Sequence, residues 1–379
     1  MRVTMKILFI NLPYYGHVVP TIGLVQELTY LGCQVTYMLP FGWEDLLQGS
    51  GAVFYGYRNH PQLSEQIKNA WSCACSIAGE FDLILYEQFF FLGKHLADKH
   101  GKPVVRIFTA PVPDKAIMEE YISSGPLSVF RCKWIARAFT KDIAKDIPMK
   151  TDNWLDEILF NPPQRNLVYT LRESHPCEEA FPEPQFVFLG PSVYPHKQTP
   201  LCLSKGTKPL VYISLGTVLK GSASFFRECV EAFRDQPADV IISVGKKFRI
   251  SRLKNLPANI SVYPYVPQQE ILGLADVFVT HGGMNSVSEA LVSRTPMVVI
   301  PFVSDQPLNG RCVEKLGVGK ILNRSQVNRE TLRQMVFSVL SDSSVRECLA
   351  KTEQLIKESP GNAGGARIIL EYWKAQNSK

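Results

Sequence analysis

Residues 265–309 read YVPQQEILGLADVFVTHGGMNSVSEALVSRTPMVVIPFVSDQPLN, and the fold of the chain can be worked out from this stretch. Its residues 277–280 are apolar and β-branched or aromatic, which is typical of a buried strand. Gly282 and Gly283 follow, and a helical pattern begins near Asn285. The order of strand, glycine turn and helix predicts one unit of a parallel sheet, with the ligand edge of the sheet at the turn.

The turn between this strand and this helix is suited to an anion. The first N–H groups of a helix have no partner within the helix, and the helix dipole places positive charge at that end. Gly282 and Gly283 let the backbone approach a bound group closely, because no side chain stands in the way. We therefore expect a phosphate beside residues 281–286.

Side chains near the turn suit the other parts of a nucleotide sugar. Glu289 follows Asn285 by one helical turn, where its carboxylate can accept both hydroxyls of a ribose. Tyr265 can stack its ring on a flat base. Asp305 and Gln306 follow the next strand, and a carboxylate beside an amide suits a polyhydroxylated ring. The alternative is an ordinary strand, turn and helix, with Asp305 and Gln306 capping the helix that comes next.

These spaced motifs resemble one family closely. The order Tyr-Val-Pro-Gln, then His-Gly-Gly-x-Asn-Ser-x-x-Glu, then Thr-Pro-Met-Val-Val-Ile-Pro with Asp-Gln is similar to the donor signature of family-1 glycosyltransferases. Enzymes of this family transfer sugar from UDP-sugars to small molecules, and the form HGGMNS resembles their bacterial macrolide-glycosyltransferase branch. The resemblance implies donor contacts from Ser214, Gly216, Thr217, Tyr265, Val266, Gln268, His281, Gly283, Asn285, Ser286, Glu289, Asp305 and Gln306.

Length and charge limit the classes of protein to consider. The 379 residues have room for two α/β domains, and 45% hydrophobic with 20% charged residues is typical of a soluble globular protein. The net charge of +6 is mild and is not gathered in one basic run, so we expect no nucleic-acid partner. This charge can favour an anionic nucleotide donor or an acidic membrane surface.

The cysteines and the N-terminus favour a cytoplasmic protein. The nine cysteines are scattered and show no zinc spacing, which indicates reduced thiols. The first apolar run is short, and Pro-Tyr-Tyr-Gly-His follows it rather than a small-residue cleavage site, so we interpret it as a strand and not as a signal peptide. No stretch approaches the ~20 apolar residues of a membrane span.

The rhythm of strands and helices occurs twice. Residues 6–12, a helix from Thr21 and residues 35–39 form a β-α-β pattern, with a loop expected at 13–20. The resemblance implies the GT-B architecture, in which two Rossmann-like α/β domains with parallel sheets face each other across a cleft and a last helix packs back on the first domain. The expected division is an acceptor-binding domain at 1–196, a linker at 197–208, a donor domain at 209–365 and the C-terminal helix at 366–379.

Sugar transfer needs a base for the acceptor hydroxyl. Histidine has the unperturbed pKa nearest to neutrality and is the natural general base. His17 follows the first strand, and a Gly-His at this place is the catalytic base in the resembled family. That family has an Asp after the strand at 82–86, where this chain has Glu87, which we expect to orient His17. The alternatives are a loop histidine that contacts only backbone and a strand-end glutamate that faces solvent.

The departing diphosphate needs preorganised hydrogen-bond donors. We expect them at His281, Gly283, Asn285, Ser286 and the loop at 214–217. The chain contains no Asp-x-Asp, so we expect no metal and no cofactor besides the nucleotide sugar. A single base without a second catalytic carboxylate implies, together with the resemblance, a direct displacement with inversion. UDP-glucose is the expected donor from family frequency alone.

The acceptor is the least determined partner. We expect an apolar small molecule that contacts residues 112–150 together with Tyr15, Phe89, Phe90 and Phe91. Residues 131–150 include six basic and two acidic residues. This composition is compatible with a solvated lobe, with an acceptor-binding lobe or with peripheral contact with a membrane. A lipid glycosyltransferase anchored by this segment is one alternative. The others are a non-catalytic sugar-nucleotide-binding homologue and a nucleotide-sugar epimerase with the same two-domain architecture. We expect a monomer or a weak homodimer.

Overall fold

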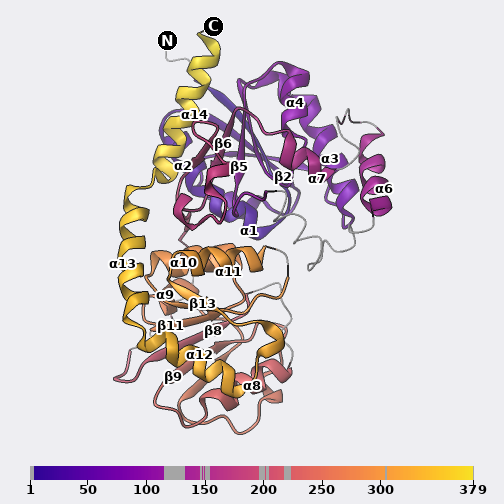
Figure 1. Ribbon diagram of the computed structural model, residues 1–379. Coiled ribbons are helices and arrows are strands. Elements are labelled where there is room, and N and C mark those ends of the chain that lie inside the picture. Colours follow the sequence, from indigo (N-terminus) through magenta and orange to yellow (C-terminus); the bar gives the residue numbers. More distant parts are fainter. Residues whose placement is uncertain are drawn as a thin grey trace. The chain divides into compact units, whose positions relative to one another are not determined.

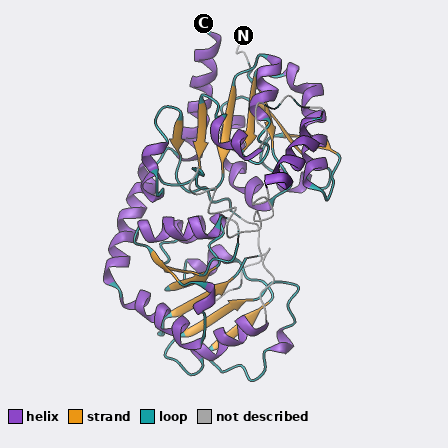
Figure 2. Cartoon of the chain, turned by 45° about the vertical axis from the view of Figure 1, so that its right-hand side comes forward, coloured by secondary structure: helices purple, strands orange, loops and turns teal. Residues whose placement is uncertain are grey.

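The computed structural model describes residues 4–114, 133–145, 147, 149, 154–195, 201, 205–216, 223–303 and 305–378. The chain divides into two compact units (Figure 1). The first contains residues 1–172, 177–194 and 359–379, and the second contains residues 173–176 and 195–358. Each unit has its own parallel sheet covered by helices (Figure 2), which confirms the predicted α/β class with two Rossmann-like domains.

The sheet of the first unit has seven parallel strands. They are β1 (Lys6–Ile10), β2 (Gln34–Pro40), β3 (Val53–Tyr57), β4 (Leu83–Glu87), β5 (Val104–Phe108), β6 (Arg165–Val168) and β7 (Phe186–Phe188), in the order β3-β2-β1-β4-β5-β6-β7. Successive side chains point to opposite faces of a sheet. Leu8 and Ile84 therefore lie in one core, and Ile7 and Leu83 lie in the other.

Helices cover both faces of this first sheet. They are α1 (Tyr15–Val18), α2 (Ile22–Tyr30), α3 (Leu63–Ile77), α4 (Gly93–His100), α6 (Lys133–Ala144), α7 (Trp154–Phe160) and α14 (Gly361–Asn377). On one face, α3 and α4 contribute Trp71 and Leu96 to the core. On the other face, α14 packs against α2, and their side chains Leu28 and Ile369 are fully buried there.

The loop expected at 13–20 is wrong, because α1 and a short 3₁₀ turn at Val19–Thr21 occupy most of it. Pro20 lies in the first positions of the 3₁₀ turn. A proline there loses no hydrogen bond, and its fixed φ suits a helical turn. Pro20 is thus compatible with a tight helical segment.

The sheet of the second unit has six parallel strands. They are β8 (Leu210–Ser214), β9 (Asp239–Ser243), β10 (Ile260–Tyr263), β11 (Val277–Thr280), β12 (Met297–Val299) and β13 (Gly319–Ile321), in the order β10-β9-β8-β11-β12-β13. The helices of this unit are α8 (Ala223–Phe233), α9 (Gln268–Leu272), α10 (Met284–Val292), α11 (Gln306–Lys315), α12 (Arg329–Ser341) and α13 (Ser343–Glu358).

Both sheets contain a point at which the order of the strands reverses. In the first sheet it lies between β1 and β4, where Ile10 pairs with Tyr86. In the second it lies between β8 and β11, where Ser214 pairs with Thr280. In open α/β sheets, ligands bind beyond the carboxyl ends of the strands at such a point. The predicted catalytic residues follow β1 and end β4, and the predicted phosphate contacts follow β8 and β11.

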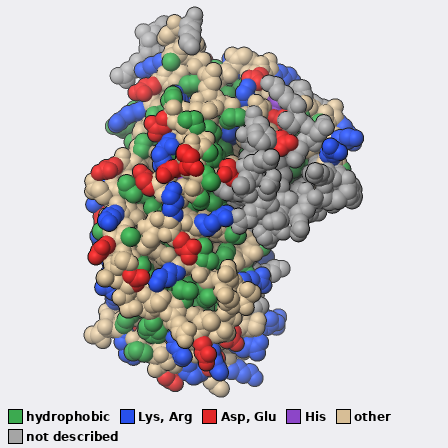
Figure 3. Space-filling view, viewed as in Figure 1, with side chains coloured by type: hydrophobic (Ala, Val, Ile, Leu, Met, Phe, Trp, Pro, Cys, Tyr) green, Lys and Arg blue, Asp and Glu red, His purple; other side chains and the backbone are tan. Residues whose placement is uncertain are grey.

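The surface shows no segregation of charge on the face in Figure 3, where acidic and basic side chains of the described residues are interspersed. Among the residues that the structure describes, no helix has both the length and the apolar character needed to cross a membrane. Residues 115–132 and most of the expected linker at 197–208 lie outside the described residues.

Candidate functional site

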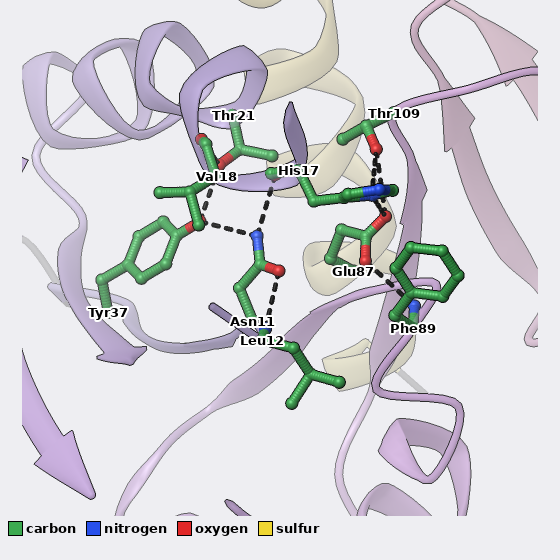
Figure 4. Close-up of polar contacts among 9 residues, drawn as sticks. All are labelled: Asn11, Leu12, His17, Val18, Thr21, Tyr37, Glu87, Phe89 and Thr109. Carbon is green, nitrogen blue, oxygen red and sulfur yellow. Dashed lines mark hydrogen bonds and ion pairs between the residues drawn. The ribbon is translucent and has the colours of Figure 1, made fainter. Parts of the chain in front are cut away.

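His17 and Glu87 lie side by side at the reversal point of the first sheet (Figure 4). The Nδ1 atom of His17 is 2.8 Å from the Oε1 atom of Glu87. The side chain of Glu87 is completely buried, whereas 20% of the side-chain surface of His17 is exposed. The other carboxylate oxygen of Glu87, Oε2, accepts a 2.9 Å hydrogen bond from the backbone N–H of Phe89. Glu87 therefore faces His17 and not solvent.

Thr109 is a third member of this group that the sequence analysis missed. Its strand β5 pairs with β4 and ends at Phe108, so Thr109 lies at the same sheet edge as Glu87. The Oγ1 atom of Thr109 is 2.8 Å from Nδ1 of His17 and donates a 3.1 Å hydrogen bond to Oε1 of Glu87. Thr109 directly follows β5, at the edge of the sheet where ligands bind, and this position could have indicated a site residue from the sequence.

The contacts at Nδ1 determine which nitrogen of His17 is basic. An ionised carboxylate only accepts hydrogen bonds, so the proton of the neutral ring is assigned to Nδ1, which faces Glu87. The basic lone pair is then on Nε2. An imidazole that a buried carboxylate orients in this way, and that is partly exposed, can take a proton from a hydroxyl group.

Aromatic side chains surround the ring of His17. The ring centroids of His17 and Phe89 are 4.4 Å apart. Tyr14 packs edge-on against both, with centroid distances of 5.9 Å to His17 and 5.6 Å to Phe89. Tyr14 is 41% exposed and Tyr15 is 47% exposed, so this apolar surface is open to a ligand. Tyr14 was missed by the sequence analysis, although it adjoins the predicted contact Tyr15.

Phe90 and Phe91 do not belong to this exposed aromatic surface. Their side chains are 0% and 4% exposed and lie in the core beneath α3 and α4. Phe91 packs against Trp154 with a centroid distance of 5.7 Å. The expectation that both contact an acceptor is therefore wrong. The three adjacent phenylalanines look alike in the sequence, and the turn after β4 directs two of them into the core.

His281 lies between two glycines at the reversal point of the second sheet. A Cβ added at Gly216 would come within 2.6 Å of the His281 ring, and one added at Gly283 would come within 2.5 Å. Gly216 (φ 72°) and Gly282 (φ 83°) also adopt left-handed backbone conformations, which residues with a Cβ rarely adopt. These glycines allow the turns after β8 and β11 to close around one imidazole.

Burial keeps this imidazole neutral. It lowers the pKa of His281 to about 4. The Nδ1 atom of His281 is buried and has no hydrogen-bond partner among the described residues. Helix α10 begins at Met284, with Gly283 as its N-cap, so the N–H groups of its first turn follow this ring directly. A neutral imidazole beside a helix N-terminus suits a phosphate oxygen as a ligand.

Glu289 is buried and is held by two glutamines of α9. Gln268 Nε2 donates to Oε2 of Glu289 at 2.6 Å, and Gln269 Nε2 donates to Oε1 at 3.1 Å. Gln268 Nε2 also donates to Ser286 Oγ at 3.2 Å, and the hydroxyl of Tyr212 donates to Gln268 Oε1 at 3.2 Å. The structure therefore brings Gln268, Ser286 and Glu289 together. A ribose at Glu289 would share the carboxylate with Gln268 and Gln269.

Tyr265 is an exposed aromatic side chain next to this cluster. It is 44% exposed, while its neighbour Val266 is 1% exposed. The ammonium of Lys246 is 5.5 Å from the centroid of the Tyr265 ring. Tyr265 therefore presents a ring on which a base can stack, and Val266 can contribute only through its backbone.

Asp305 and Gln306 begin α11, and both are held by internal hydrogen bonds. Gln306 Oε1 accepts from the backbone N–H groups of Phe302 and Val303 at 2.8 and 3.0 Å. Asp305 Oδ2 accepts from Asn309 Nδ2 at 2.9 Å. Asp305 occupies the N-cap position, but its side chain makes no capping hydrogen bond with the described part of the chain. The amide nitrogen of Gln306 and the second oxygen of Asp305 are not used in these bonds.

Three further predicted contacts complete the donor set. Ser214 is buried, and its Oγ accepts a 3.3 Å hydrogen bond from the N–H of Gly216 within the turn. Asn285 is half-buried in the first turn of α10. Thr217 lies outside the described residues. Apart from Thr217, the predicted donor residues thus lie at the carboxyl ends of β8, β10, β11 and β12, in the turns that follow these strands or in the first turns of the next helices.

Comparisons with known proteins show the family to which the chain is similar. Residues 192–363 match the family model described as "UDP-glucoronosyl and UDP-glucosyl transferase". The chain is 30% identical to NDP-glycosyltransferase YjiC of Bacillus licheniformis, over 96% of this chain and 96% of the relative. It is 26% identical to the oleandomycin glycosyltransferase of Streptomyces antibioticus, over 96% of this chain and 90% of the relative.

A solved structure shows the same architecture. The glycotransferase of kitacinnamycin superposes with a TM-score of 0.83 at 26% identity, over 98% of this chain and 99% of that chain. Since the sequence relationship extends over nearly the whole chain, the fold and the predicted family are both confirmed. The chain belongs to the family-1 UDP-glycosyltransferases, with relatives in the bacterial macrolide-glycosyltransferase branch, and is an enzyme that transfers sugar from a nucleotide sugar to an acceptor.

Proposed function

We propose that this enzyme transfers a hexose, with glucose as the first candidate, from a UDP-sugar to a hydroxyl group of an apolar small molecule. In this proposal His17 is the general base, Glu87 orients it, and the anomeric carbon is inverted. The observation that carries the proposal is the contact of Nδ1 of His17 with Oε1 of the buried Glu87 at 2.8 Å.

The buried carboxylate matters because His17 becomes a cation when it accepts a proton. A carboxylate in a low-dielectric site stabilises this imidazolium more than water would. The three contacts of Glu87, with His17, Thr109 and the N–H of Phe89, offset the cost of burying its charge. The added methylene of Glu, compared with the Asp of the resembled family, still leaves an oxygen in hydrogen-bond contact with His17.

The transfer step is a single displacement. Nε2 of His17 removes the proton from the acceptor hydroxyl, and the oxygen forms a bond to the anomeric carbon. The bond from that carbon to the diphosphate breaks, and its electron pair leaves with UDP. Attack opposite the leaving group gives a β-linked product from an α-linked donor.

The donor groups of the second unit support stabilisation of the departing diphosphate. Neutral His281, the N–H groups at the start of α10 and the turn at Ser214 and Gly216 are preorganised by burial and by glycine conformations. Tyr265 offers a stacking surface for the base, and Glu289 a carboxylate for the ribose. We propose that these groups act without a metal ion, since the chain has no Asp-x-Asp.

The aromatic surface at His17 supports an apolar acceptor. Tyr14 and Phe89 present rings against the base, and a polyketide or phenolic ring system can pack on them. Tyr15, which adjoins Tyr14 in the chain, is also exposed. The names of two similar proteins, a glycosyltransferase of oleandomycin and one of kitacinnamycin, are consistent with a natural-product acceptor. The membrane alternative depends on residues 131–150, which the structure describes only in part.

The test is acceptor-dependent release of UDP from UDP-glucose in EDTA, with a pooled panel of phenolic and polyketide alcohols. The wild type should release UDP only with acceptor, and His17→Ala should lose this release by about 10²-fold or more. Mass spectrometry and the anomeric proton coupling of the product would then identify the acceptor and the stereochemistry. Release that needs added Mg²⁺, or that survives in His17→Ala, would contradict the proposal. Activity confined to anionic vesicles that contain lipid alcohols would favour a lipid acceptor.

A further inference from the structure

Three buried polar side chains hold the helical turn that carries His17 (Figure 4). Asn11 follows β1, Thr21 ends the 3₁₀ turn, and Tyr37 lies in the middle of β2. All three side chains are 0% exposed. Their hydrogen bonds connect the three side chains with one another and with the backbone of the turn.

Two backbone carbonyls of α1 are the points of attachment. Asn11 Nδ2 donates a 2.9 Å hydrogen bond to the carbonyl of His17. Thr21 Oγ1 donates a 2.7 Å hydrogen bond to the carbonyl of Val18. These two carbonyls are the last of a four-residue helix. The carbonyls at the end of a helix have no partner within the helix, so they need hydrogen bonds from outside.

Tyr37 joins the two attachments, and the directions of all the bonds are determined. Thr21 uses its only hydroxyl proton on Val18, so in the 2.7 Å contact between Thr21 Oγ1 and the Tyr37 hydroxyl, Tyr37 is the donor. The oxygen of Tyr37 accepts from Asn11 Nδ2 at 3.0 Å. Asn11 Oδ1 accepts from the N–H of Leu12 at 2.8 Å. Each N–H and O–H proton of these three side chains therefore has one acceptor.

We propose that Asn11, Thr21 and Tyr37 are positioning residues for His17, which set the distance of its ring from Glu87 during transfer. This inference rests on the proposed role of His17 as the base. A helix of four residues cannot hold its own geometry, because a single helical turn is unstable without outside contacts. The three side chains supply these contacts on the sheet side of the turn, at the carbonyl of His17 itself.

The burial of the network makes it rigid. Because all three side chains are shielded from solvent, each of these hydrogen bonds is strong, and an unpaired member would be costly. Burial also raises the pKa of the Tyr37 hydroxyl, so it keeps its proton and remains a donor near neutral pH. The ring of Tyr37 packs against Phe9 with a centroid distance of 4.5 Å, which fixes the place of its hydroxyl.

The test uses substitutions that remove one hydroxyl and keep the shape. Tyr37→Phe removes the donor to Thr21 and the acceptor of Asn11. Thr21→Val removes the bond to Val18, and Thr21→Ser restores it. Tyr169→Phe is the matched control, because Tyr169 is buried in the same core and its hydroxyl donates to Asn362 Oδ1 at 2.8 Å, away from His17.

We expect Tyr37→Phe and Thr21→Val to lower kcat by about tenfold or more, since a small misplacement of a catalytic group is costly. The KM for UDP-glucose should change less than about twofold, and the acidic limb of the pH–rate profile should move to lower pH, because a proton on His17 is less well stabilised by Glu87. Thr21→Ser should recover most of kcat. Tyr169→Phe should lower the melting temperature but change kcat by less than about twofold.

Other results separate the two levels of the proposal. If Tyr37→Phe and Thr21→Val show the same kcat and the same pH profile as the control Tyr169→Phe, the network is only structural. That result would overturn the inference. If Tyr37→Phe does not fold, the comparison of Thr21→Val with Thr21→Ser decides in the same way. An active His17→Ala would instead remove the proposed base itself, whatever the behaviour of these variants.

Discussion

At the scale of single residues, the pairing of His17 with a glutamate is the feature on which catalysis depends. Glu87 is completely buried, and both of its oxygens are engaged, one by His17 and Thr109 and the other by the N–H of Phe89. These contacts fix the carboxylate in place beside the imidazole. Its charge is therefore available to the imidazolium that forms during transfer.

Removal of this charge should slow transfer without loss of fold. Glu87→Gln keeps the size of the side chain but cannot stabilise an imidazolium, so we expect kcat to fall by about 10²-fold. The acidic limb of the pH–rate profile should move to lower pH, because protonated His17 is less stable without the carboxylate. Steady-state rates between pH 5 and 9 measure both effects. Glu87→Asp is the control and should retain more activity than Glu87→Gln; equal rates in the two variants would contradict a role for the charge.

His281 should make the stability of the enzyme depend on pH. Burial lowers the pKa of His281 to about 4, below the 6.5 of an unperturbed histidine. Below pH 6.5 the unfolded chain binds a proton that the folded chain does not, so stability falls as the pH falls towards 4. By pH 5 this contribution amounts to about 2 kcal/mol.

The measurement is the melting temperature of the wild type and of His281→Asn at pH 7 and pH 5. The variant cannot titrate at this position, so its melting temperature should drop less between the two pH values. An equal drop in both proteins would mean that His281 does not titrate as its burial requires.

At the scale of elements, the strand, turn and helix around residues 277–292 could be predicted from the sequence, because a buried strand, two glycines and a helical repeat each have a local physical cause. The helix α1 could not be predicted. Its four residues have no periodicity of their own, and side chains distant in sequence, Asn11 and Tyr37 among them, hold it. The burial of Phe90 and Phe91 was missed for a similar reason, because tertiary packing and not local pattern decides it.

The glycines around His281 should be required for donor binding. Gly283→Ala would place a Cβ within 2.5 Å of the His281 ring, so the ring or the turn must move. We expect UDP to bind at least about tenfold more weakly, as measured by isothermal titration calorimetry. Gly273→Ala is the control in the same unit, since its φ is −63° and the nearest atom lies 3.4 Å from the added Cβ. UDP affinity that is unchanged in Gly283→Ala would mean that this turn does not contact the nucleotide.

At the scale of the whole molecule, the chain ends in the unit in which it begins. Helix α14 belongs to the first unit, where Ala366, Ile369 and Tyr372 lie in the same core as β1 and α2. A helix was predicted from residue 366, whereas α14 begins at Gly361, and a helical pattern does not state which core a helix joins. Only the resemblance to a known family suggested the destination of this helix. The parallel sheets, in contrast, follow from alternating strands and helices.

The packing of α14 should contribute to the stability of the first unit. Ile369→Ala removes a fully buried side chain, and we expect it to cost about 2–5 kcal/mol and to lower the melting temperature. Arg367→Ala, on the exposed side of the same helix, should change stability by less than about 0.5 kcal/mol. Equal melting temperatures of Ile369→Ala and Arg367→Ala would contradict the packing of this helix against α2.

The central claim is that His17 removes the proton of the acceptor, and acceptors of different acidity test it most directly. The ratio of kcat/KM between wild type and His17→Ala should be measured for an aliphatic alcohol and for 4-nitrophenol, with UDP-glucose as donor. If His17 is the base, the ratio should be on the order of 10²–10⁴ for the alcohol and much smaller for the phenol, which ionises without help near neutral pH. The same ratio for both acceptors would mean that His17 contributes to binding or structure and not to proton removal.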